Sequence, residues 1–203
     1  MVAATPDMTA YCFDAILAKL QNRKQPTCPP TISTDKYPIF VTWKKGHRHD
    51  LRGCIGTFSR DLPLPKALVD YAEISAFRDS RFRPITLEEV PALQCGVSLL
   101  VQFEPADNDM DWTVGTHGIR IEFKQHGRRL SSVYLPEVAS EQGWNNIETL
   151  EHLMRKGGFE GPIYEKDRKE VVIERFQSSK IVMSFDEYCS FKKNQGIVIP
   201  PLF

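Results

Sequence analysis

No stretch of this 203-residue sequence approaches the ~20 consecutive apolar residues of a membrane helix, which excludes a membrane-spanning protein. Internal repeats and low-complexity tracts are also missing. Basic and acidic residues number 26 each, and this zero net charge excludes a uniformly basic nucleic-acid coat but not a local basic patch. The length is typical of one large domain or two small lobes that need neither a disulfide nor a metal to fold.

Cysteine is sparse and scattered. The five cysteines are odd in number and no two have the Cys-x-x-Cys spacing, so neither a disulfide framework nor a zinc site is indicated. We expect no metal and no cofactor. The N-terminal segment MVAATPDMTA has no charged start before an apolar core and is not rich in arginine, so we expect no secretory signal or mitochondrial presequence. These features favour the cytoplasm, the nucleus or both.

Hydrophobic periodicity predicts helices and strands in irregular alternation. Helices are expected over residues 7–23, 64–78 and 146–156, with Asp7 and Asn145 as caps, and a capping box at Thr86 and Glu89 begins a short helix that Pro91 stops. Strands are expected over residues 37–45, 50–58, 95–103, 118–124, 129–135 and 169–183, the last with a break near 178–179. Strands and helices without regular βαβ spacing favour an α+β fold, a mainly antiparallel sheet flanked by helices.

Residues 51–57 (LRGCIGT) form the most informative segment. Side chains alternate along a strand, so two faces are predicted: Leu51, Gly53, Ile55 and Thr57 on one, and Arg52, Cys54, Gly56 and Phe58 on the other. The Leu/Ile face is expected to pack on a core. The other face places a thiol beside a guanidinium, which favours a reactive thiolate, next to a glycine that permits close approach of a ligand. The alternative is a buried structural cysteine with Arg52 in an ordinary ion pair.

These residues resemble the signature of the AMMECR family. Further segments resemble other motifs of that family: residues 75–84 (SAFRDSRFRP), 114–119 (VGTHGI), 134–139 (YLPEVA) with 142–144 (QGW), and 153–158 (LMRKGG) in its animal form. The resemblance covers about residues 7–190 and identifies the chain as a single AMMECR-like domain, with residues 191–203 as a C-terminal tail. Many prokaryotic members carry a cysteine where this chain has residues 153–155 (LMR), which argues against a two-cysteine mechanism here.

The resemblance implies an α+β fold of two unequal lobes, with the signature in the region between them. It implies no established reaction. Prokaryotic relatives are linked with Memo-type proteins and radical S-adenosylmethionine enzymes, which suggests an RNA, nucleotide or modification context. Nuclear localisation is reported for animal members of the family.

The second motif adds positive charge to the signature. Arg78, Arg81 and Arg83 lie at or beyond the end of the 64–78 helix, with Asp79 and Phe82 between them. Guanidinium groups bind phosphate in bidentate fashion and aromatic rings stack on bases, so this segment together with Arg52 is a candidate site for an anion or single-stranded nucleic acid. The alternative is helix capping by Arg78, surface ion pairs with Asp79, and aromatic rings in the core.

A catalytic set drawn from the motifs would contain Cys54, His117 and Glu137. An imidazole oriented by a carboxylate could activate the thiol. The alternatives are that His117 bonds to backbone in a turn and that Glu137 interacts with a helix dipole. Whether the protein is an enzyme stays open.

We expect the two motifs to form one concave site together with the His117–Gly118 turn. The predicted ligand-binding residues are Arg52, Gly53, Gly56, Asp79, Arg81, Phe82 and Gly118. The expected ligand bears phosphate or is a nucleic acid, with RNA or a nucleotide as examples. The other two hypotheses are an enzyme with Cys54 as nucleophile and an adaptor for a Memo-type partner protein.

Overall fold

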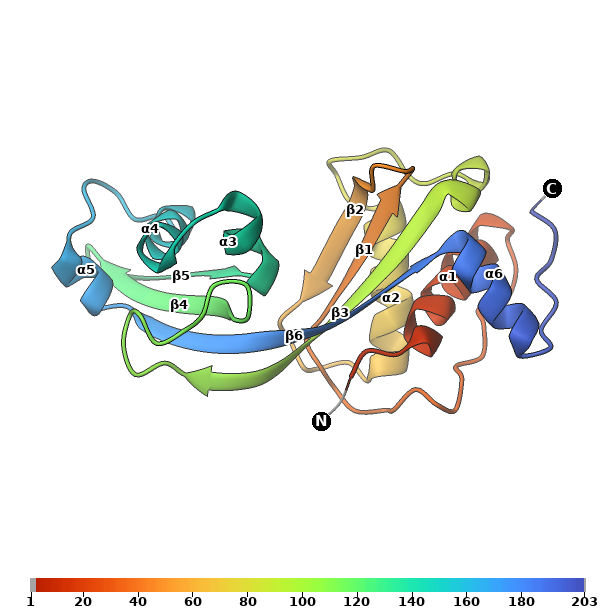
Figure 1. Cartoon of the computed structure of the whole chain (residues 1–203), viewed down its shortest axis with the longest axis horizontal. Coiled ribbons are helices and arrows are strands. Elements are labelled where there is room, and N and C mark those ends of the chain that lie inside the picture. The colour runs from red at the N-terminus through yellow and green to blue at the C-terminus, as the bar shows by residue number, and fades with distance from the viewer. Residues whose placement is uncertain (1–2, 203) are drawn as a thin grey trace. The chain divides into compact units, whose positions relative to one another are not determined.

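The computed structural model describes residues 3–202, so the first two residues of the N-terminal segment and the last residue of the predicted tail lie outside the described residues (Figure 1). The elements follow one another as α1 (Pro6–Leu20), β1 (Ile39–Lys45), β2 (Asp50–Thr57), α2 (Leu64–Phe77), η1 (Leu87–Ala92), β3 (Leu93–Pro105), β4 (Gly118–Gln125), β5 (Arg128–Tyr134), α3 (Pro136–Gln142), α4 (Asn146–Lys156), α5 (Glu165–Lys169), β6 (Val172–Ser184) and α6 (Phe185–Asn194).

The six strands form one sheet with the order β2-β1-β3-β6-β4-β5. Strand β1 pairs antiparallel with β2 and β3, and β4 pairs antiparallel with β5 and β6, so the predicted α+β class with an antiparallel sheet is confirmed. The chain divides into two compact units. Unit 1 comprises the described residues up to Leu99 and from Ser179 onward, and unit 2 comprises Leu100–Ser178. Strands β3 and β6 each run from one unit into the other.

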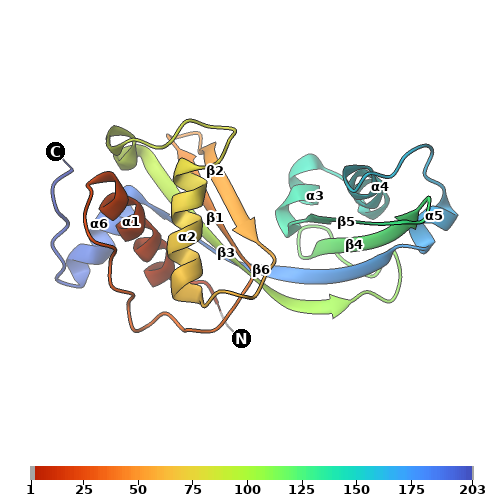
Figure 2. The same cartoon turned by 180° about the vertical axis from the view of Figure 1, so that it is seen from behind.

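In unit 1, helices α1 and α2 cover one face of the strands (Figure 2). Trp43 of β1 is fully buried there. Its indole Nε1 donates to the Ala72 carbonyl of α2 at 3.2 Å, and its ring meets Phe13 of α1 edge-on at 5.1 Å. The alternating apolar residues of β1 and the apolar face of each helix therefore bury one another, which is the main source of stability for such a layer.

Helix α6 is attached to α1 by a buried polar cluster. Lys192 is 8% exposed, and its ammonium lies 2.5 Å from Oδ2 of Asp14. The Tyr188 hydroxyl donates to the other oxygen of the same carboxylate at 2.7 Å. Within the predicted tail, residues up to Asn194 belong to α6, and the Pro201 carbonyl accepts from the Gln21 amide at 2.9 Å. The tail thus contacts the end of α1 in its own unit.

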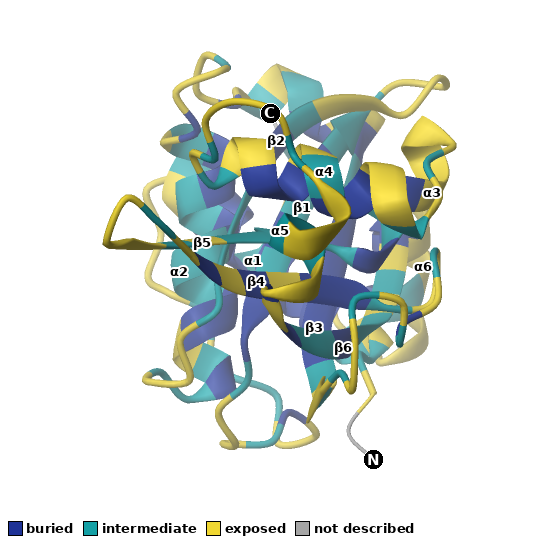
Figure 3. Ribbon diagram, turned by 90° about the vertical axis from the view of Figure 1, so that its left-hand side faces the viewer, coloured by how far each residue is buried: buried dark blue, intermediate teal, exposed yellow. Residues whose placement is uncertain are grey.

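Unit 2 has its own core between α4 and the strands. The inward residues of β4 alternate with exposed charged ones, as predicted, and this pattern is visible in the burial colours of Figure 3. The side chains buried in this core are Trp112, Ile119, Ile121, Phe123, Leu150, Leu153, Met154, Val171 and Ile173. Helix α4 begins with the predicted cap, because Asn145 Oδ1 accepts from the Glu148 amide at 2.9 Å.

Several predicted details are wrong. Strand β6 is continuous through residues 178–179, and its expected first residues belong instead to the short helix α5 and the turn after it. Thr5 rather than Asp7 is the N-cap of α1, because Pro6 already has helical geometry and places Asp7 in the first turn. Pro91 lies inside the short 3-10 helix η1 and does not end it.

Candidate functional site

Strand β2, which carries the signature, is an edge strand, and β1 pairs with it on one side only. Thr42 of β1 is the register partner of Cys54 on one side and of Gly96 in β3 on the other. The Thr42 hydroxyl lies 3.1 Å from the Cys54 thiol, within hydrogen-bond reach. Cys54, Thr42 and Gly96 therefore form a row of small residues across three strands, named here the cross-strand row.

The cross-strand row lies on the sheet face that points away from α1 and α2. Trp43 and Met183 contact these helices, so the residues before and after them in their strands point to the other face. We call this the polar face of unit 1. It is formed by Phe40, Thr42, Lys44, Cys54, Gly56, Gln94, Gly96, Ser98, Lys180 and Val182.

A small cavity of about 40 Å³ opens on the polar face beside the cross-strand row. Thr42 and Gly96 line it together with Lys44, Gln94, Lys180 and Val182. The missing side chain of Gly96 leaves this space free. None of these residues was predicted to bind a ligand, although the alternation of β1 and β3 places Lys44 and Gln94 on one face with Thr42.

A bulge changes the faces predicted for β2. The register shifts between Trp43 and Lys44, so Trp43 pairs with Gly53 while Lys44 pairs with Leu51, and Arg52 is the additional residue. Leu51 therefore leaves the helix-facing side and is 41% exposed. The expectation that Leu51 packs on the core is wrong for this reason.

The two signature glycines allow close backbone and ring contacts. A Cβ on Gly53 would lie 2.0 Å from the Ser75 carbonyl oxygen of α2, and one on Gly56 would lie 2.4 Å from the Phe40 ring. Gly53 thus brings α2 against the strand. Phe40 covers Gly56 and meets the Phe58 ring edge-on at 5.3 Å, so packing accounts for both glycines.

Arg52 is held by groups of the protein itself. Its Nε and Nη2 donate to the two oxygens of Glu89 at 3.0 and 2.9 Å, and Nη1 donates to the Arg83 carbonyl at 2.7 Å. The side chains of Arg52 and Glu89 are 13% and 17% exposed. Glu89 also accepts from Lys45 at 2.8 Å, and the bonds from Arg52, the largest cause, lower the pKa of Glu89 to about 2.

Asp79 and Arg81 bind the backbone of Cys54. Oδ2 of Asp79 accepts from the Cys54 amide at 2.9 Å, and Nη2 of Arg81 donates to the Cys54 carbonyl at 3.1 Å. Arg81 also makes a bidentate pair with Asp79 through Nε at 2.9 Å and Nη2 at 2.6 Å. These bonds from Arg81 are the main reason why the pKa of Asp79 lies well below its ordinary value, while burial opposes the shift.

The two members of this pair differ in exposure. The Asp79 side chain is 4% exposed, whereas that of Arg81 is 54% exposed. The Arg81 guanidinium also lies 5.5 Å from the centre of the Phe82 ring. Its Nη1 has no hydrogen-bond partner within residues 3–202, so one edge of this cation stays available to a ligand.

The other predicted site residues belong to unit 2. The His117 Nδ1 accepts from the Thr113 amide at 2.9 Å, so His117 does bond to backbone in a turn. A Cβ on Gly118 would lie 2.5 Å from the Phe176 ring, and Glu137 lies in the first turn of α3. The structure thus brings Arg52, Cys54, Asp79 and Arg81 together within unit 1. That His117, Gly118 and Glu137 join them stays a prediction.

The remaining cysteines differ in burial. Cys12 and Cys95 are buried, and burial raises the pKa of the Cys95 thiol, whereas Cys28 and Cys189 are partly exposed. Across residues 3–202, no three or more His, Cys, Asp or Glu side chains are grouped so as to hold a metal ion. No described helix is both long enough and apolar enough to cross a membrane.

Comparison with known proteins gives the family. The family model described as AMMECR1 matches residues 9–181. An uncharacterized protein of Arabidopsis thaliana is 43% identical over 206 residues, covering 98% of this chain and 95% of its own, and one of Schizosaccharomyces pombe is 44% identical, covering 88% and 92%. The crystal structure of an uncharacterized protein from Pyrococcus horikoshii superposes with a TM-score of 0.70 at 27% identity, covering 86% of this chain and 89% of its own. The chain therefore belongs to the AMMECR1 family.

Proposed function

We propose that this protein binds an anionic, phosphate-bearing ligand on the polar face of unit 1, with the cross-strand row at the centre of the site. The observation that carries the proposal is the charge of this face. Its ionisable side chains beyond the Cys54 thiol are Lys44 and Lys180, and none of its residues is acidic. Within the unit 1 strands, the only acidic residue is Asp50 at the hairpin tip, where it pairs with Arg48 at 3.3 Å.

The exposed edge of Arg81 extends this positive surface past Cys54. A ligand at this surface would meet the exposed guanidinium of Arg81 before the buried carboxylate of Asp79. The negative charge of Asp79 therefore cancels the positive charge of Arg81 only in part at the surface. Lysine and arginine donors beside a hydroxyl and an amide are suited to phosphate oxygens. The Gly96 position leaves room for such a group next to Thr42 and Gln94.

Arg52 has a different part in this proposal. Four of its donor contacts are already made to Glu89 and to the carbonyls of Arg83 and Pro84. It therefore acts as a positioning residue that holds the bulged strand in place. The ligand contacts are assigned to Arg81 and Lys44 instead.

The proposal is tested by alkylating the native protein with iodoacetate and with iodoacetamide, and comparing the two rates at each cysteine by mass spectrometry. A positive site enriches the anionic reagent, so the ratio of iodoacetate to iodoacetamide rates should be about threefold higher at Cys54 than at Cys28 and Cys189, and should fall with salt. Lys44→Gln should lower the ratio at Cys54, whereas the control Lys24→Gln should not. Equal ratios at the three cysteines would contradict the proposal.

Two kinds of phosphate-bearing ligand, a nucleotide and a nucleic acid, are distinguished by whether each protects Cys54 from alkylation by iodoacetamide. Protection by AMP or ATP would identify a nucleotide. Protection by a single-stranded RNA oligonucleotide but not by AMP, with an affinity that falls steeply with salt, would identify a nucleic acid. Gly96→Val, which fills the cavity, should abolish protection in either case.

A second candidate function is catalysis with Cys54 as nucleophile. The partly exposed thiol within 3.1 Å of the Thr42 hydroxyl supports it. His117 and Glu137 would have to supply the base and its orienting carboxylate. An alkylation rate at Cys54 that inflects well below the ordinary thiol value of about 8.5, and that shifts in His117→Ala, would favour this function over binding. A Memo-type partner and a nuclear or cytoplasmic location stay predictions from the family resemblance.

A further inference from the structure

Strand β5 forms the second edge of the sheet, because only β4 pairs with it. His126 and Gly127 close the β4–β5 hairpin as a two-residue turn, and such a turn is flanked by a hydrogen-bonded pair, here Gln125 and Arg128. Hydrogen-bonded and non-hydrogen-bonded pairs alternate along an antiparallel ladder. The amide and carbonyl of Arg129, the next residue of β5, therefore point away from β4.

The same alternation gives β5 an outer row of open backbone groups. Ser131 and Val133 follow Arg129 at intervals of two, so their amides and carbonyls also point outward. The Lys156 ammonium supports this assignment, because it donates to the Val133 carbonyl at 2.8 Å. Apart from that bond, the outward backbone groups of these three strand residues have no hydrogen-bond partner within residues 3–202. We call Arg129, Ser131 and Val133 the open edge.

The two edges of the sheet differ in how they are protected. At the other edge, Asp79 and Arg81 bind the amide and the carbonyl of Cys54. No side chain of the described part of the chain binds the outward amides of the open edge. An edge strand with free amides and carbonyls is a template for an extended chain, which adds to the sheet as a further strand.

Cationic side chains surround the open edge. Arg128 and Arg129 are exposed, and Lys156, also exposed, reaches the edge at Val133. None of these three cations forms an ion pair with any residue that the structure describes, and β5 contains no acidic residue. A second copy of β5 would bring like charges together, which opposes self-pairing. An extended chain with acidic side chains would instead be attracted to this edge.

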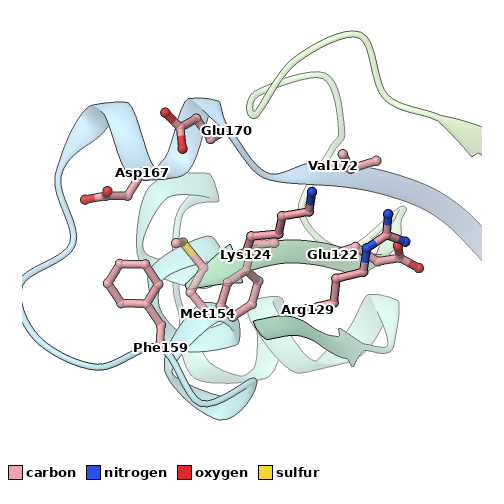
Figure 4. A pocket seen from close by; sticks show the side chains of 9 residues that line it. Glu122, Lys124, Arg129, Met154, Phe159, Asp167, Glu170 and Val172 are labelled. Atoms are coloured by element: carbon pink, nitrogen blue, oxygen red, sulfur yellow. The ribbon is translucent and has the colours of Figure 1, made fainter. Parts of the chain in front are cut away.

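The acidic side chains on the sheet face of Arg129 lie further from the edge. Glu122 belongs to β4 and pairs with Arg120 at 3.3 Å. Figure 4 shows Asp167 and Glu170 on α5, separated from Arg129 by β4, and together these residues line a pocket of mixed charge. A strand added to β5 would lie about 10 Å from β4, which is two strand spacings and about one Debye length. The cations at the edge therefore act on an added strand more strongly than these carboxylates do.

We propose that the open edge binds an extended acidic segment of a partner protein as an additional antiparallel or parallel strand. The backbone of the segment bonds to the outward amides and carbonyls of Arg129 and Ser131. Its carboxylates pair with Arg128, Arg129 and Lys156, which select an acidic chain over a second copy of β5. The site lies wholly in unit 2 and is independent of the ligand proposed for unit 1.

The charge selection is tested with two fluorescein-labelled peptides and the full-length protein, by fluorescence polarisation at low salt. The acidic peptide is Thr-Glu-Val-Glu-Val-Glu-Thr, and the basic peptide has lysine in place of each glutamate. The acidic peptide should bind at least about tenfold more tightly than the basic one. Arg128→Gln/Arg129→Gln should weaken the acidic peptide about tenfold. Lys166→Gln/Lys169→Gln makes the same change in net charge on α5 and should leave its affinity unchanged.

The backbone contact is tested at Ser131. Ser131→Pro removes an outward amide and leaves the bonds to β4 in place, so it should weaken the acidic peptide at least about tenfold, whereas Ser131→Thr keeps the amide and should bind as the wild type does. In the wild-type protein, the acidic peptide should slow hydrogen exchange of the Arg129 and Ser131 amides. This measurement decides even if Ser131→Pro does not fold.

Four results would overturn the proposal. They are equal affinity for the acidic and basic peptides, including no binding of either at about 1 mM, equal affinity of Ser131→Pro and Ser131→Thr, and unchanged exchange at Arg129 and Ser131. The fourth is a concentration-dependent dimer that Ser131→Pro abolishes, which would assign the open edge to a second copy of this chain.

Discussion

The carboxylate of Asp79 closes the exposed edge of the signature strand at Cys54, with 2.9 Å between Oδ2 and the Cys54 nitrogen. The Cys54 amide therefore points away from β1, and Arg81 completes the cover by donating to the Cys54 carbonyl at 3.1 Å. An edge strand with open amides and carbonyls invites pairing with other chains. The Asp79–Arg81 pair thus makes the hydrogen bonds to the Cys54 amide and carbonyl that a neighbouring strand would otherwise make.

Removal of this carboxylate should open the edge locally. We expect Asp79→Ala to accelerate hydrogen exchange of the Cys54 amide and to lower the free energy of unfolding by about 2 kcal/mol, because a buried, charged acceptor is lost. Asp70→Ala is the control, since Asp70 makes only a surface pair with Lys66 and its loss should cost less than about 0.5 kcal/mol. Unchanged exchange at Cys54 in Asp79→Ala would show that this bond does not protect the edge.

Glu89 should make stability depend on acid pH. Its pKa in the folded protein is about 2, below the ordinary value of 4.5, so its contribution is complete above about 4.5 and is lost as the pH falls towards 2. We expect Glu89→Gln to lose about 2 kcal/mol at neutral pH, because Arg52 loses its anionic partner, and progressively less as the pH falls through this window. Urea titrations at several pH values measure this. The control Glu141→Gln, at an exposed position, should follow the wild type throughout.

Two glycines of the same layer should respond in opposite ways to alanine. Gly53→Ala should cost about 3 kcal/mol or more, because its Cβ would lie 2.0 Å from the Ser75 carbonyl oxygen and would push α2 away from β2. At Gly96 the nearest heavy atoms would be 3.8 Å away, so Gly96→Ala should be neutral or stabilising by up to about 1 kcal/mol. Denaturation midpoints of the two variants measure these changes in stability. Similar losses of stability in Gly53→Ala and Gly96→Ala would show that the contact with α2 is not the reason for the cost at Gly53.

Asp14 should be essential for the attachment of α6 to α1. Lys192 is only 8% exposed, and Asp14→Asn removes the anion that pairs with its ammonium group. We therefore expect the free energy of unfolding to fall by about 3 kcal/mol. Asp14→Asn/Lys192→Met removes the stranded charge and should recover part of that loss. A double variant no more stable than Asp14→Asn would show that the buried cation is not the source of the penalty.

Features that depend on neighbouring residues were predictable from the sequence. The strands predicted over residues 118–124 and 129–135 correspond to β4 and β5, and His126 and Gly127 between them have the positive φ angles of 50° and 74° that such a tight turn requires. Asn145 was predicted as the cap of α4, and the α+β class followed from the irregular alternation of the predicted strands and helices. The reason is physical: caps, turns and amphipathic faces are set by residues within one or two turns of each other.

Only the tertiary structure decided which groups meet across long stretches of chain. Arg52 pairs with Glu89, which lies 37 residues further along the sequence, and the Cys54 amide donates to Asp79, which lies 25 residues further along. A bulge of one residue turned Leu51 away from the helix-facing side, and β6 continues through residues 178–179 with β3 and β4 as its neighbours in the sheet. Such partners depend on how helices and strands pack, and a guanidinium or a carboxylate is compatible with many partners until packing excludes all but one. The sequence by itself therefore determined the elements and the residues that carry charge, whereas packing determined that Arg52 is committed within the protein and that Arg81 presents a free edge.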